Sequence, residues 1–334
     1  MKAAVLGAGS WGTTFAQVLA DAGTRTVLYA RDPAVADAVN SAHENPKYLP
    51  GVSLNPALTA TPDPAAALAD TDLAVFSVPA QTLRSCLADW APLIPDGALL
   101  VSLMKGIELS TCKRMSEVIT ETLGAAESRV AVVSGPNLAR EVAARQNAAA
   151  VVACADAGGA RRLQEACHTP YFRPYWSTDV IGCELAGSIK NVVALLVGMA
   201  VAIGLGDNTR ATLITRGLAE MARLGQALGA DFQTFAGLAG MGDLVATCSS
   251  PLSRNRTLGQ HLGEGMTVAE AKAVTGQTAE GLASYAPLLE LARKHDVDMP
   301  ITEVVGAVIT GRLPMSEVST VLTSRSAKPE WYGS

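Results

Sequence analysis

The chain has 334 residues, of which 49% are hydrophobic and 17% charged, and its formal net charge is −5. This composition excludes a disordered chain, and the length predicts two domains. The negative charge argues against nucleic acid or an anionic membrane surface as a partner. The six cysteines form no C-x-x-C pair and have no histidine at zinc-ligand spacing, so we expect no metal site and a reducing compartment.

The N-terminal segment "MKAAVLGAGSWG" begins a predicted strand almost at once, which leaves no room for a signal peptide. The longest apolar run without a charge, Val192 to Leu205, is shorter than the roughly 20 residues that a membrane span needs. We therefore expect a soluble cytoplasmic protein without membrane insertion.

Short apolar segments alternate with helical patterns in the first half of the chain. Phe15, Val18 and Leu19 recur at helical spacing, and Gly23 is expected to end that helix. Alternating strands and helices predict βαβ units, and therefore a Rossmann-type α/β domain with a mostly parallel sheet. The expected strands are Ala3–Leu6, Thr26–Tyr29, Leu73–Val78, Ala98–Leu103, Val130–Ser134 and Ala149–Ala153.

Strand signals fade after about residue 180, and helical patterns follow one another to the end of the chain. Asp207 or Thr209 is expected to cap one helix, and 267–270 reads as a capping box. Pro287 predicts a kink or boundary within another helical pattern. We expect a dinucleotide-binding domain at 1–180 and an all-α substrate-binding domain at 181–334, with the boundary near 178–182.

Three glycines, Gly7, Gly9 and Gly12, form a G-x-G-x-x-G motif between the first predicted strand and the first predicted helix. In this context the first glycine permits a tight turn, the second admits a pyrophosphate, and the third lets the helix pack against the sheet. Free N–H groups at the start of the helix then bind the phosphates. The motif predicts a nicotinamide dinucleotide site.

The type of dinucleotide depends on the residues that follow the second strand. Arg31 can pair with a 2′-phosphate, which favours NADPH. Asp32 can accept a hydrogen bond from a ribose hydroxyl and keeps NADH possible.

Lys190 stands at the head of an apolar helical segment just beyond the predicted α/β domain. Hydride transfer to a carbonyl generates an alkoxide that needs a proton, and a lysine whose pKa is lowered by burial can supply it. Lys190 is therefore the candidate general acid.

Seven short motifs are spread over nearly the whole chain. They are "GAGSWGT" at 7–13, "SLMKGIE" at 102–108, "VSGPNLAREV" at 133–142, "ELAGSIKN" at 184–191, "GLAGMGDLVATC" at 237–248, "SRNRTLG" at 253–259 and "TAEG" at 278–281. Together they resemble the bacterial NAD(P)-dependent glycerol-3-phosphate dehydrogenase family. The resemblance implies interconversion of dihydroxyacetone phosphate and sn-glycerol 3-phosphate, which supplies the backbone of phospholipids. It also implies a helical domain like the C-terminal domain of 6-phosphogluconate dehydrogenase, and a homodimer.

The resemblance also implies the roles of individual residues. Lys190 would be the catalytic proton donor or acceptor, with Asp243 beside it. The implied substrate contacts are Lys105, Gly135, Asn137, Lys190, Asp243, Ser253, Arg254 and Asn255. The implied cofactor contacts are Gly7, Gly9, Ser10, Trp11, Gly12, Arg31, Lys105, Ala139, Arg254, Thr278 and Glu280. Asn137 and Thr278 depart from the family pattern, in which we expect a small hydroxyl residue and a valine.

Two other functions are compatible with parts of this pattern. A β-hydroxyacid dehydrogenase shares the two-domain plan, but its catalytic helix resembles G-x-x-x-K-x-x-x-N, whereas Ala194 lies one turn after Lys190 here. A non-catalytic NAD(P)-binding sensor would need the glycine motif but not Lys190, Asp243 and Arg254.

Overall fold

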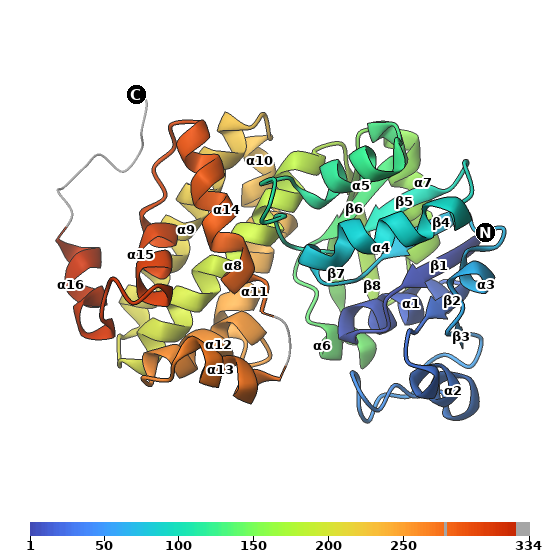
Figure 1. The fold of residues 1–334 in the computed structure, drawn as a ribbon, viewed down its shortest axis with the longest axis horizontal. Helices are drawn as coiled ribbons and strands as arrows, with labels where there is room; N and C mark the ends of the chain where they lie inside the picture. Colours follow the sequence, from blue (N-terminus) through green and yellow to red (C-terminus); the bar gives the residue numbers. More distant parts are fainter. Residues whose placement is uncertain (277–278, 325–334) are drawn as a thin grey trace.

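The computed structural model describes residues 1–276 and 279–324. Figure 1 shows an N-terminal half built on a sheet and a C-terminal half built of helices. The sheet has eight strands in the order β3-β2-β1-β4-β5-β6-β7-β8. Their bounds are β1 Lys2–Leu6, β2 Arg25–Tyr29, β3 Thr59–Thr61, β4 Leu73–Phe76, β5 Leu99–Ser102, β6 Val130–Ser134, β7 Ala148–Cys154 and β8 Phe172–Ser177.

The expected mostly parallel sheet is confirmed. Strands β1 to β6 pair in parallel, β7 pairs antiparallel to β6, and β8 pairs in parallel with β7. All six strands predicted from the sequence are present within a few residues of their expected ends, while β3 and β8 were not predicted. Strands β1 and β4 are neighbours, but the strands that follow β1 lie on one side of the pair and those that follow β4 lie on the other. The carboxyl ends of β1 and β4 therefore flank the switch point of the sheet, where dinucleotides bind.

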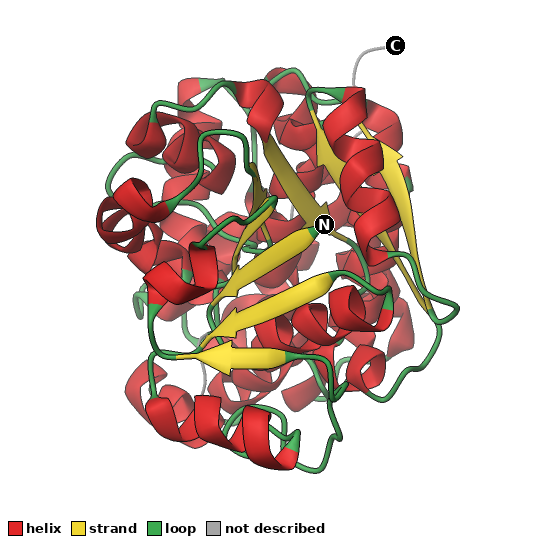
Figure 2. Ribbon diagram, turned by 90° about the vertical axis from the view of Figure 1, so that its right-hand side faces the viewer, coloured by secondary structure: helices red, strands yellow, loops and turns green. Residues whose placement is uncertain are grey.

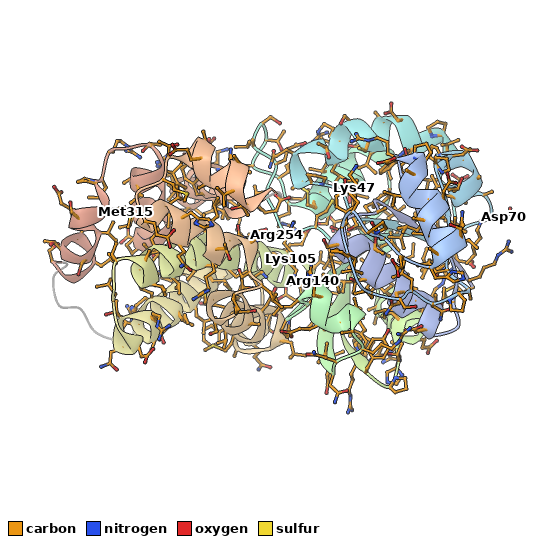
Figure 3. The ribbon with its side chains drawn as sticks, turned by 90° about the horizontal axis from the view of Figure 1, so that it is seen from below. Lys47, Asp70, Lys105, Arg140, Arg254 and Met315 are labelled. Atoms are coloured by element: carbon orange, nitrogen blue, oxygen red, sulfur yellow. The ribbon has the colours of Figure 1, made fainter. Side chains whose placement is uncertain are left out.

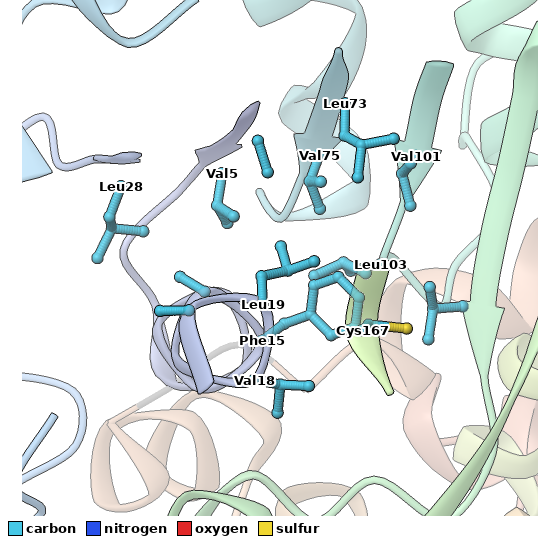
Figure 4. Packing of buried hydrophobic residues seen from close by; sticks show 14 of the residues in the cluster. Val5, Phe15, Val18, Leu19, Leu28, Leu73, Val75, Val101, Leu103 and Cys167 are labelled. Carbon is cyan, nitrogen blue, oxygen red and sulfur yellow. The ribbon is translucent and has the colours of Figure 1, made fainter. Parts of the chain in front are cut away.

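Helices cover both faces of the sheet, as Figure 2 shows. Those of the first half are α1 Ser10–Asp21, α2 Pro33–Ala42, α3 Pro64–Leu68, α4 Leu83–Trp90, α5 Met115–Leu123, α6 Ala139–Ala143 and α7 Ala157–Cys167. Helix α1 ends as expected, with Gly23 in the left-handed region at φ +82°. Its apolar face packs Phe15 and Leu19 against strand residues that include Val5 and Val75 (Figure 4).

The second half of the described chain is helical, as expected. Its helices are α8 Val180–Ala202, α9 Asp207–Ala227, α10 Phe232–Ala236, α11 Asp243–Ser249, α12 Arg254–Gly263, α13 Val268–Thr275, α14 Gly281–Lys294, α15 Pro300–Ile309 and α16 Val318–Thr323. The capping box at Thr267 and Glu270 is present. The expected cap of α9 is wrong, because Gly206 holds the N-cap position and Asp207 is already helical. Pro287 marks no boundary, since α14 continues through it.

Helix α8 is the central element of the helical domain. Its 23 residues make it long and apolar enough to cross a membrane by those criteria alone, so the expectation that this segment is too short is wrong. However, 89% of its most apolar stretch of 18 residues is buried within the protein. It packs against α9, α11, α12 and α14 (Figure 1), and its apolar surface is therefore covered by protein.

Helices α8 and α12 cross at very short range. A Cβ atom built on Gly198 of α8 would lie 2.0 Å from the carbonyl oxygen of Arg256, and one on Gly259 of α12 would lie 2.0 Å from that of Leu195. No side chain fits in either place. This crossing fixes the start of α12 next to the polar residues of α8, where the candidate site lies.

Candidate active site

The glycine-rich loop joins β1 to α1 and leaves no space for side chains at two of its three glycines. Gly7 has φ +125°, and a Cβ there would lie 2.3 Å from the carbonyl oxygen of Ser77 at the end of β4. A Cβ on Gly12 would lie 2.0 Å from the carbonyl oxygen of Gly7. These positions require glycine for the fold itself.

Gly9 differs, because a Cβ on it would meet no protein atom within 4 Å. It occupies the N-cap position of α1, and no side chain of the loop caps the helix. The N–H groups at the start of α1 are thus left to bind an external anion, and the open space at Gly9 lets that anion approach. The loop therefore fits the pyrophosphate of a dinucleotide.

The segment from His43 to Leu49 supports this loop from outside. Asn45 is fully buried and donates hydrogen bonds to the carbonyl oxygen of Ala8 at 2.9 Å and to Oγ1 of Thr13 at 2.8 Å. Ser10 donates its hydroxyl proton to the carbonyl oxygen of Tyr48 at 2.7 Å. Because its hydroxyl is engaged, Ser10 is left with its backbone N–H for a phosphate.

The residues after β2 bear on the choice of cofactor. Asp32 caps α2 by accepting a hydrogen bond from the N–H of Ala34 at 3.1 Å, and it forms an ion pair with Lys47 at 2.9 Å. These contacts engage both of its carboxylate oxygens. Arg31 is exposed and has no hydrogen bond or ion pair within 1–276 and 279–324. The guanidinium is thus the group free to meet the ribose end of a dinucleotide.

A buried lysine and a buried aspartate form the centre of the site. Nζ of Lys190, on α8, donates to Oδ1 of Asp243 and to Oγ1 of Thr247, both on α11 and both at 2.7 Å. The side chain of Lys190 is 8% exposed and that of Asp243 is 2% exposed. One turn of α11 separates Asp243 from Thr247, so the two oxygens face the ammonium group together.

Burial lowers the pKa of Lys190 from its usual 10.5 to about 8. The carboxylate of Asp243 opposes this shift by favouring the charged ammonium, and the nearby ammonium of Lys105 adds to it by repulsion. The result is an amine that can be protonated or neutral near neutral pH, as a group that exchanges protons with a substrate requires.

A second lysine reaches the same carboxylate from the sheet domain. Lys105 follows β5, and its Nζ donates to Oδ2 of Asp243 at 2.7 Å and to the carbonyl oxygen of Gly135, after β6, at 2.9 Å. Asp243 thus joins ammonium groups from the two halves of the chain. Figure 3 shows Lys105 at their junction, with Arg254 nearby in that view.

Two residues at and just after the end of β6 carry buried polar atoms that have no hydrogen-bond partner within the described residues. They are Asn137, with both of its side-chain polar atoms, and Ser134, with its hydroxyl. Buried polar groups are normally satisfied, and unpartnered ones fit a site that a bound molecule completes. Asn137, which departs from the family pattern, therefore has donors and an acceptor free for a ligand.

The segment Ser253–Asn255 forms the N-terminus of α12. The Ser253 hydroxyl caps the helix by accepting from the N–H of Arg256 at 3.3 Å. Arg254 is exposed as a residue, but partial burial of its guanidinium lowers the pKa of that group, and it makes no hydrogen bond or ion pair in the described part of the chain. The side chain of Asn255 is buried and already engaged with Asn191. Arg254 and the first N–H groups of α12 therefore form the anion-binding part of this segment.

The remaining predicted cofactor residues lie on both sides of the junction. Ala139 opens α6, and its carbonyl oxygen accepts from the Thr14 hydroxyl of α1 at 3.2 Å. Glu280 comes just before α14, and its carboxylate accepts from the N–H of Ala80, after β4, at 3.2 Å. Thr278 lies outside the described residues.

Sequence reasoning missed two members of this cluster. Thr247 shares the ammonium of Lys190 with Asp243, and its spacing of one helical turn after Asp243 is a signal that could have found it. Asn191 donates to the carbonyl oxygen of Lys105 at 3.2 Å. No sequence pattern marks that contact, because it joins residues 86 positions apart.

A dinucleotide loop beside an acid–base lysine, between a sheet domain and a helical domain, is the arrangement of a nicotinamide-dependent dehydrogenase. Family models narrow this class: the N-terminal model of NAD-dependent glycerol-3-phosphate dehydrogenase matches residues 2–160, and the C-terminal model matches 179–320. The chain belongs to the NAD-dependent glycerol-3-phosphate dehydrogenase family.

Individual relatives agree with this assignment. The chain is 62% identical over 333 residues to a glycerol-3-phosphate dehydrogenase [NAD(P)+] of Thermobifida fusca, covering 99% of each chain. It is 56% identical to one of Corynebacterium diphtheriae, covering 99% of this chain and 100% of the relative. The crystal structure of glycerol-3-phosphate dehydrogenase from Coxiella burnetii superposes with a TM-score of 0.91 at 37% identity, covering 97% of this chain and 99% of that one.

Proposed function

We propose that the protein catalyses the NAD(P)-dependent interconversion of dihydroxyacetone phosphate and sn-glycerol 3-phosphate, with Lys190 as the acid–base group. The observation that carries the proposal is the buried Lys190–Asp243 pair, which Lys105 ties to the carboxyl ends of the strands. A buried amine whose pKa is lowered to about 8, near the expected position of a nicotinamide ring, supports this role.

NAD(P)H, if held by the glycine loop of Gly7, Gly9 and Gly12, would supply the hydride for C2 of the substrate. As the carbonyl oxygen gains negative charge, the ammonium of Lys190 donates a proton to it, and the product is a secondary alcohol. In the reverse direction the neutral amine removes the hydroxyl proton. Asp243 and Thr247 hold the amine in place throughout, because both oxygens lie 2.7 Å from Nζ.

The phosphate of the substrate binds at the N-terminus of α12. The Arg254 guanidinium supplies charge and paired donors, and the N–H groups of the first helical turn add further hydrogen bonds. The Ser253 side chain contributes by capping the helix rather than through direct contact. Asn137, with its unpartnered buried amide, binds the hydroxyl end of the substrate.

NADPH is the preferred cofactor in this proposal. Arg31 binds the 2′-phosphate, while Asp32 is held away from the ribose by its cap and its ion pair with Lys47. Gly7, Gly9, Gly12 and the N–H groups of Ser10 and Trp11 bind the pyrophosphate.

The two alternatives are less well supported. A hydroxyacid dehydrogenase would need a site for a bare carboxylate, whereas the α12 terminus with Arg254 suits a phosphate. A cofactor sensor would have no use for a buried lysine whose pKa is tuned toward neutrality.

The deciding experiment follows NADPH absorbance with dihydroxyacetone phosphate, with unphosphorylated dihydroxyacetone and with a 2-keto acid. We expect rapid turnover with the phosphate ester alone. Preference for the keto acid would support the hydroxyacid enzyme, and no turnover with any substrate would support the sensor.

The domain bounds of this proposal are residues 1–180 and 181–334. Three features of the biological setting rest on the family: the protein acts in the cytoplasm, it forms a homodimer, and its product serves phospholipid synthesis. Sedimentation velocity on the purified protein tests the dimer, which would give about twice the chain mass of 34.4 kDa.

A further inference from the structure

Two buried amide side chains connect opposite sides of the site. Nδ2 of Asn255, on α12, donates to Oδ1 of Asn191, on α8, at 2.9 Å. Oδ1 of Asn255 accepts from the N–H of Gly281 at 3.0 Å. Nδ2 of Asn191 donates to the carbonyl oxygens of Lys105 at 3.2 Å and Gly187 at 3.1 Å. A continuous chain of hydrogen bonds thus runs from Gly281 to Lys105.

Backbone groups at both ends fix the direction of this chain. The N–H of Gly281 can only donate, so Asn255 must present its oxygen there and its nitrogen to Asn191. The carbonyl oxygen of Lys105 can only accept, so Asn191 must present its nitrogen there. Rotating either amide by half a turn would oppose two donors or two acceptors. Each amide therefore has one satisfied orientation.

The chain is also shielded from water, since Asn191 is 5% and Asn255 is 8% exposed. Buried hydrogen bonds of this kind are costly to break, because the groups left behind find no water to replace the lost partner. A displacement of Gly281 at one end of the chain should therefore displace the backbone of Lys105 at the other end.

Each end reaches a different part of the site. Gly281 follows Glu280, whose carboxylate binds the N–H of Ala80 beside the strand ends of the sheet domain. Gly281 is also pressed against α8, where a Cβ on it would lie 2.6 Å from the carbonyl oxygen of Asn191. At the other end, Lys105 holds the carboxylate of Asp243.

We infer that Asn191 and Asn255 form an amide relay that positions Lys105 according to the placement of the segment 279–281. The two residues are positioning residues, and they couple the cofactor side of the site to the substrate side. This inference rests on the proposed function and gives the Asn255 side chain a different role from the phosphate contact expected from the sequence.

The relay has a consequence that a purely structural contact would not have. The amine of Lys190 is faced by Asp243 and Cys248 from α11 and by Lys105 from the sheet domain. The Lys105 ammonium contributes to the lowered pKa of Lys190. Loosening Lys105 weakens this repulsion, so breaking the relay should raise the pKa of Lys190.

The test uses Asn191→Leu, Asn255→Leu and the double variant of the full-length protein. We expect each single change to lower kcat/KM for dihydroxyacetone phosphate on the order of tenfold and to move the basic limb of its pH profile upward. The double variant should have about the same kcat/KM as the less active of the two single variants, because either change interrupts the same chain of hydrogen bonds. Losses that multiply, with an unmoved pH limb, would overturn the relay.

A second variant guards against misfolding. Asn255→Ser keeps a polar group but is too short to span Gly281 and Asn191, and it should reproduce the pH shift with a smaller loss of stability. The matched control is Thr302→Val, which removes a buried hydroxyl that donates to Glu220. It should lower the melting temperature and leave the pH profile unchanged.

The relay can be separated from the proposed reaction. Titration of the Lys190 side chain, followed by NMR of protein with isotope-labelled lysine, needs no turnover. An upward shift in Asn255→Ser supports the relay even if the wild type fails to reduce dihydroxyacetone phosphate, a failure that would refute only the reaction. No shift in an active enzyme would refute only the relay.

Discussion

At the scale of single residues, the surroundings of the Lys190 amine determine the chemistry of the site. Lys190 is buried on the central helix α8, and its pKa near 8 results from burial that Asp243 only partly offsets. This arrangement gives the amine a protonation state that changes within the range in which an enzyme works.

The first prediction concerns the pH dependence set by Lys190. Reduction of dihydroxyacetone phosphate needs the ammonium form, so kcat/KM should fall above about pH 8, where the proton is lost. Oxidation of glycerol 3-phosphate needs the neutral amine, so its kcat/KM should rise as the pH increases toward the same value. Initial rates in both directions check the prediction, and two profiles with the same slope would contradict it.

Removing the amine should be far more damaging than shifting its pKa. Lys190→Met should lower kcat by roughly 10²–10⁴ while the protein still folds and binds NADPH. Lys272→Met, on the exposed surface of α13, is the matched control and should be nearly normal. Near-normal turnover of Lys190→Met would remove this residue from the chemistry.

A further prediction concerns Arg31. Loss of a charge-assisted contact with a 2′-phosphate is worth about 1.5–3 kcal/mol, so Arg31→Ala should lower kcat/KM for NADPH by roughly 10- to 100-fold. NADH lacks that phosphate and serves as the internal control, with at most a small change. Equal losses with both cofactors would show that Arg31 does not read the 2′ position.

The sequence predicts these residues unequally well. Lys190 and the glycine loop could be found because each stands in a local pattern with a physical reason. The engaged side chain of Asn255 could not, since its partners Asn191 and Gly281 are distant in the sequence and only the crossing of α8 with α12 brings them together.

At the scale of elements, close packing of helices determines where the catalytic groups lie. The two glycines at the crossing of α8 and α12 allow the helices to approach until backbone meets backbone. This contact places the α12 N-terminus, with Arg254, beside the turn of α8 that carries Lys190.

Filling that crossing should destabilise the protein. We expect Gly198→Ala and Gly259→Ala each to lower the free energy of unfolding by roughly 1–3 kcal/mol, because the added methyl group collides with a carbonyl oxygen. Gly97→Ala is the control, since a Cβ there meets no atom within 4 Å. Urea denaturation measures all three, and equal stabilities would contradict the packing argument.

Two strands, β3 and β8, could not be predicted from local sequence patterns. Six were predicted because they are apolar and bounded by turn residues, but β3 has three residues and is too short to show a pattern. β8 contains Pro174, which argues against a strand unless the strand lies at an edge. Since β8 is the edge of the sheet, proline is tolerated there, but only the complete strand order reveals that position.

At the scale of the whole molecule, buried charges join the two domains. Glu184, near the start of α8, accepts from the N–H of Ser116 and from Nη1 of Arg114, both at 2.8 Å and both at the start of α5. Burial raises the pKa of Glu184, and Arg114 counteracts that rise. The carboxylate thus anchors α8 to the sheet domain.

Replacing this anchor should weaken the whole fold. Glu184→Leu leaves the Arg114 charge without its buried partner and should cost about 3 kcal/mol of stability. Lys294→Ala, which removes an exposed ion pair with Glu290, should cost less than about 1 kcal/mol. Calorimetry of both variants checks the difference, and similar melting temperatures would contradict the role of Glu184.

The two-domain plan itself was predictable, because alternation of strands and helices gives way to helices alone. The reversal of β7 was not, since the apolar pattern of a strand contains no direction. The burial of Glu184 could not be predicted either, because a glutamate in a helix is normally exposed and only the assembled fold shows that this one is buried.

The long apolar helix α8 has a consequence for the synthesis of the protein. This segment leaves the ribosome well before α12 and α14, which later cover it. A growing chain that ends between these elements displays a stretch apolar enough to be mistaken for a membrane anchor. Until its covering helices are made, that stretch is an exposed apolar surface of the kind that promotes aggregation of incomplete chains.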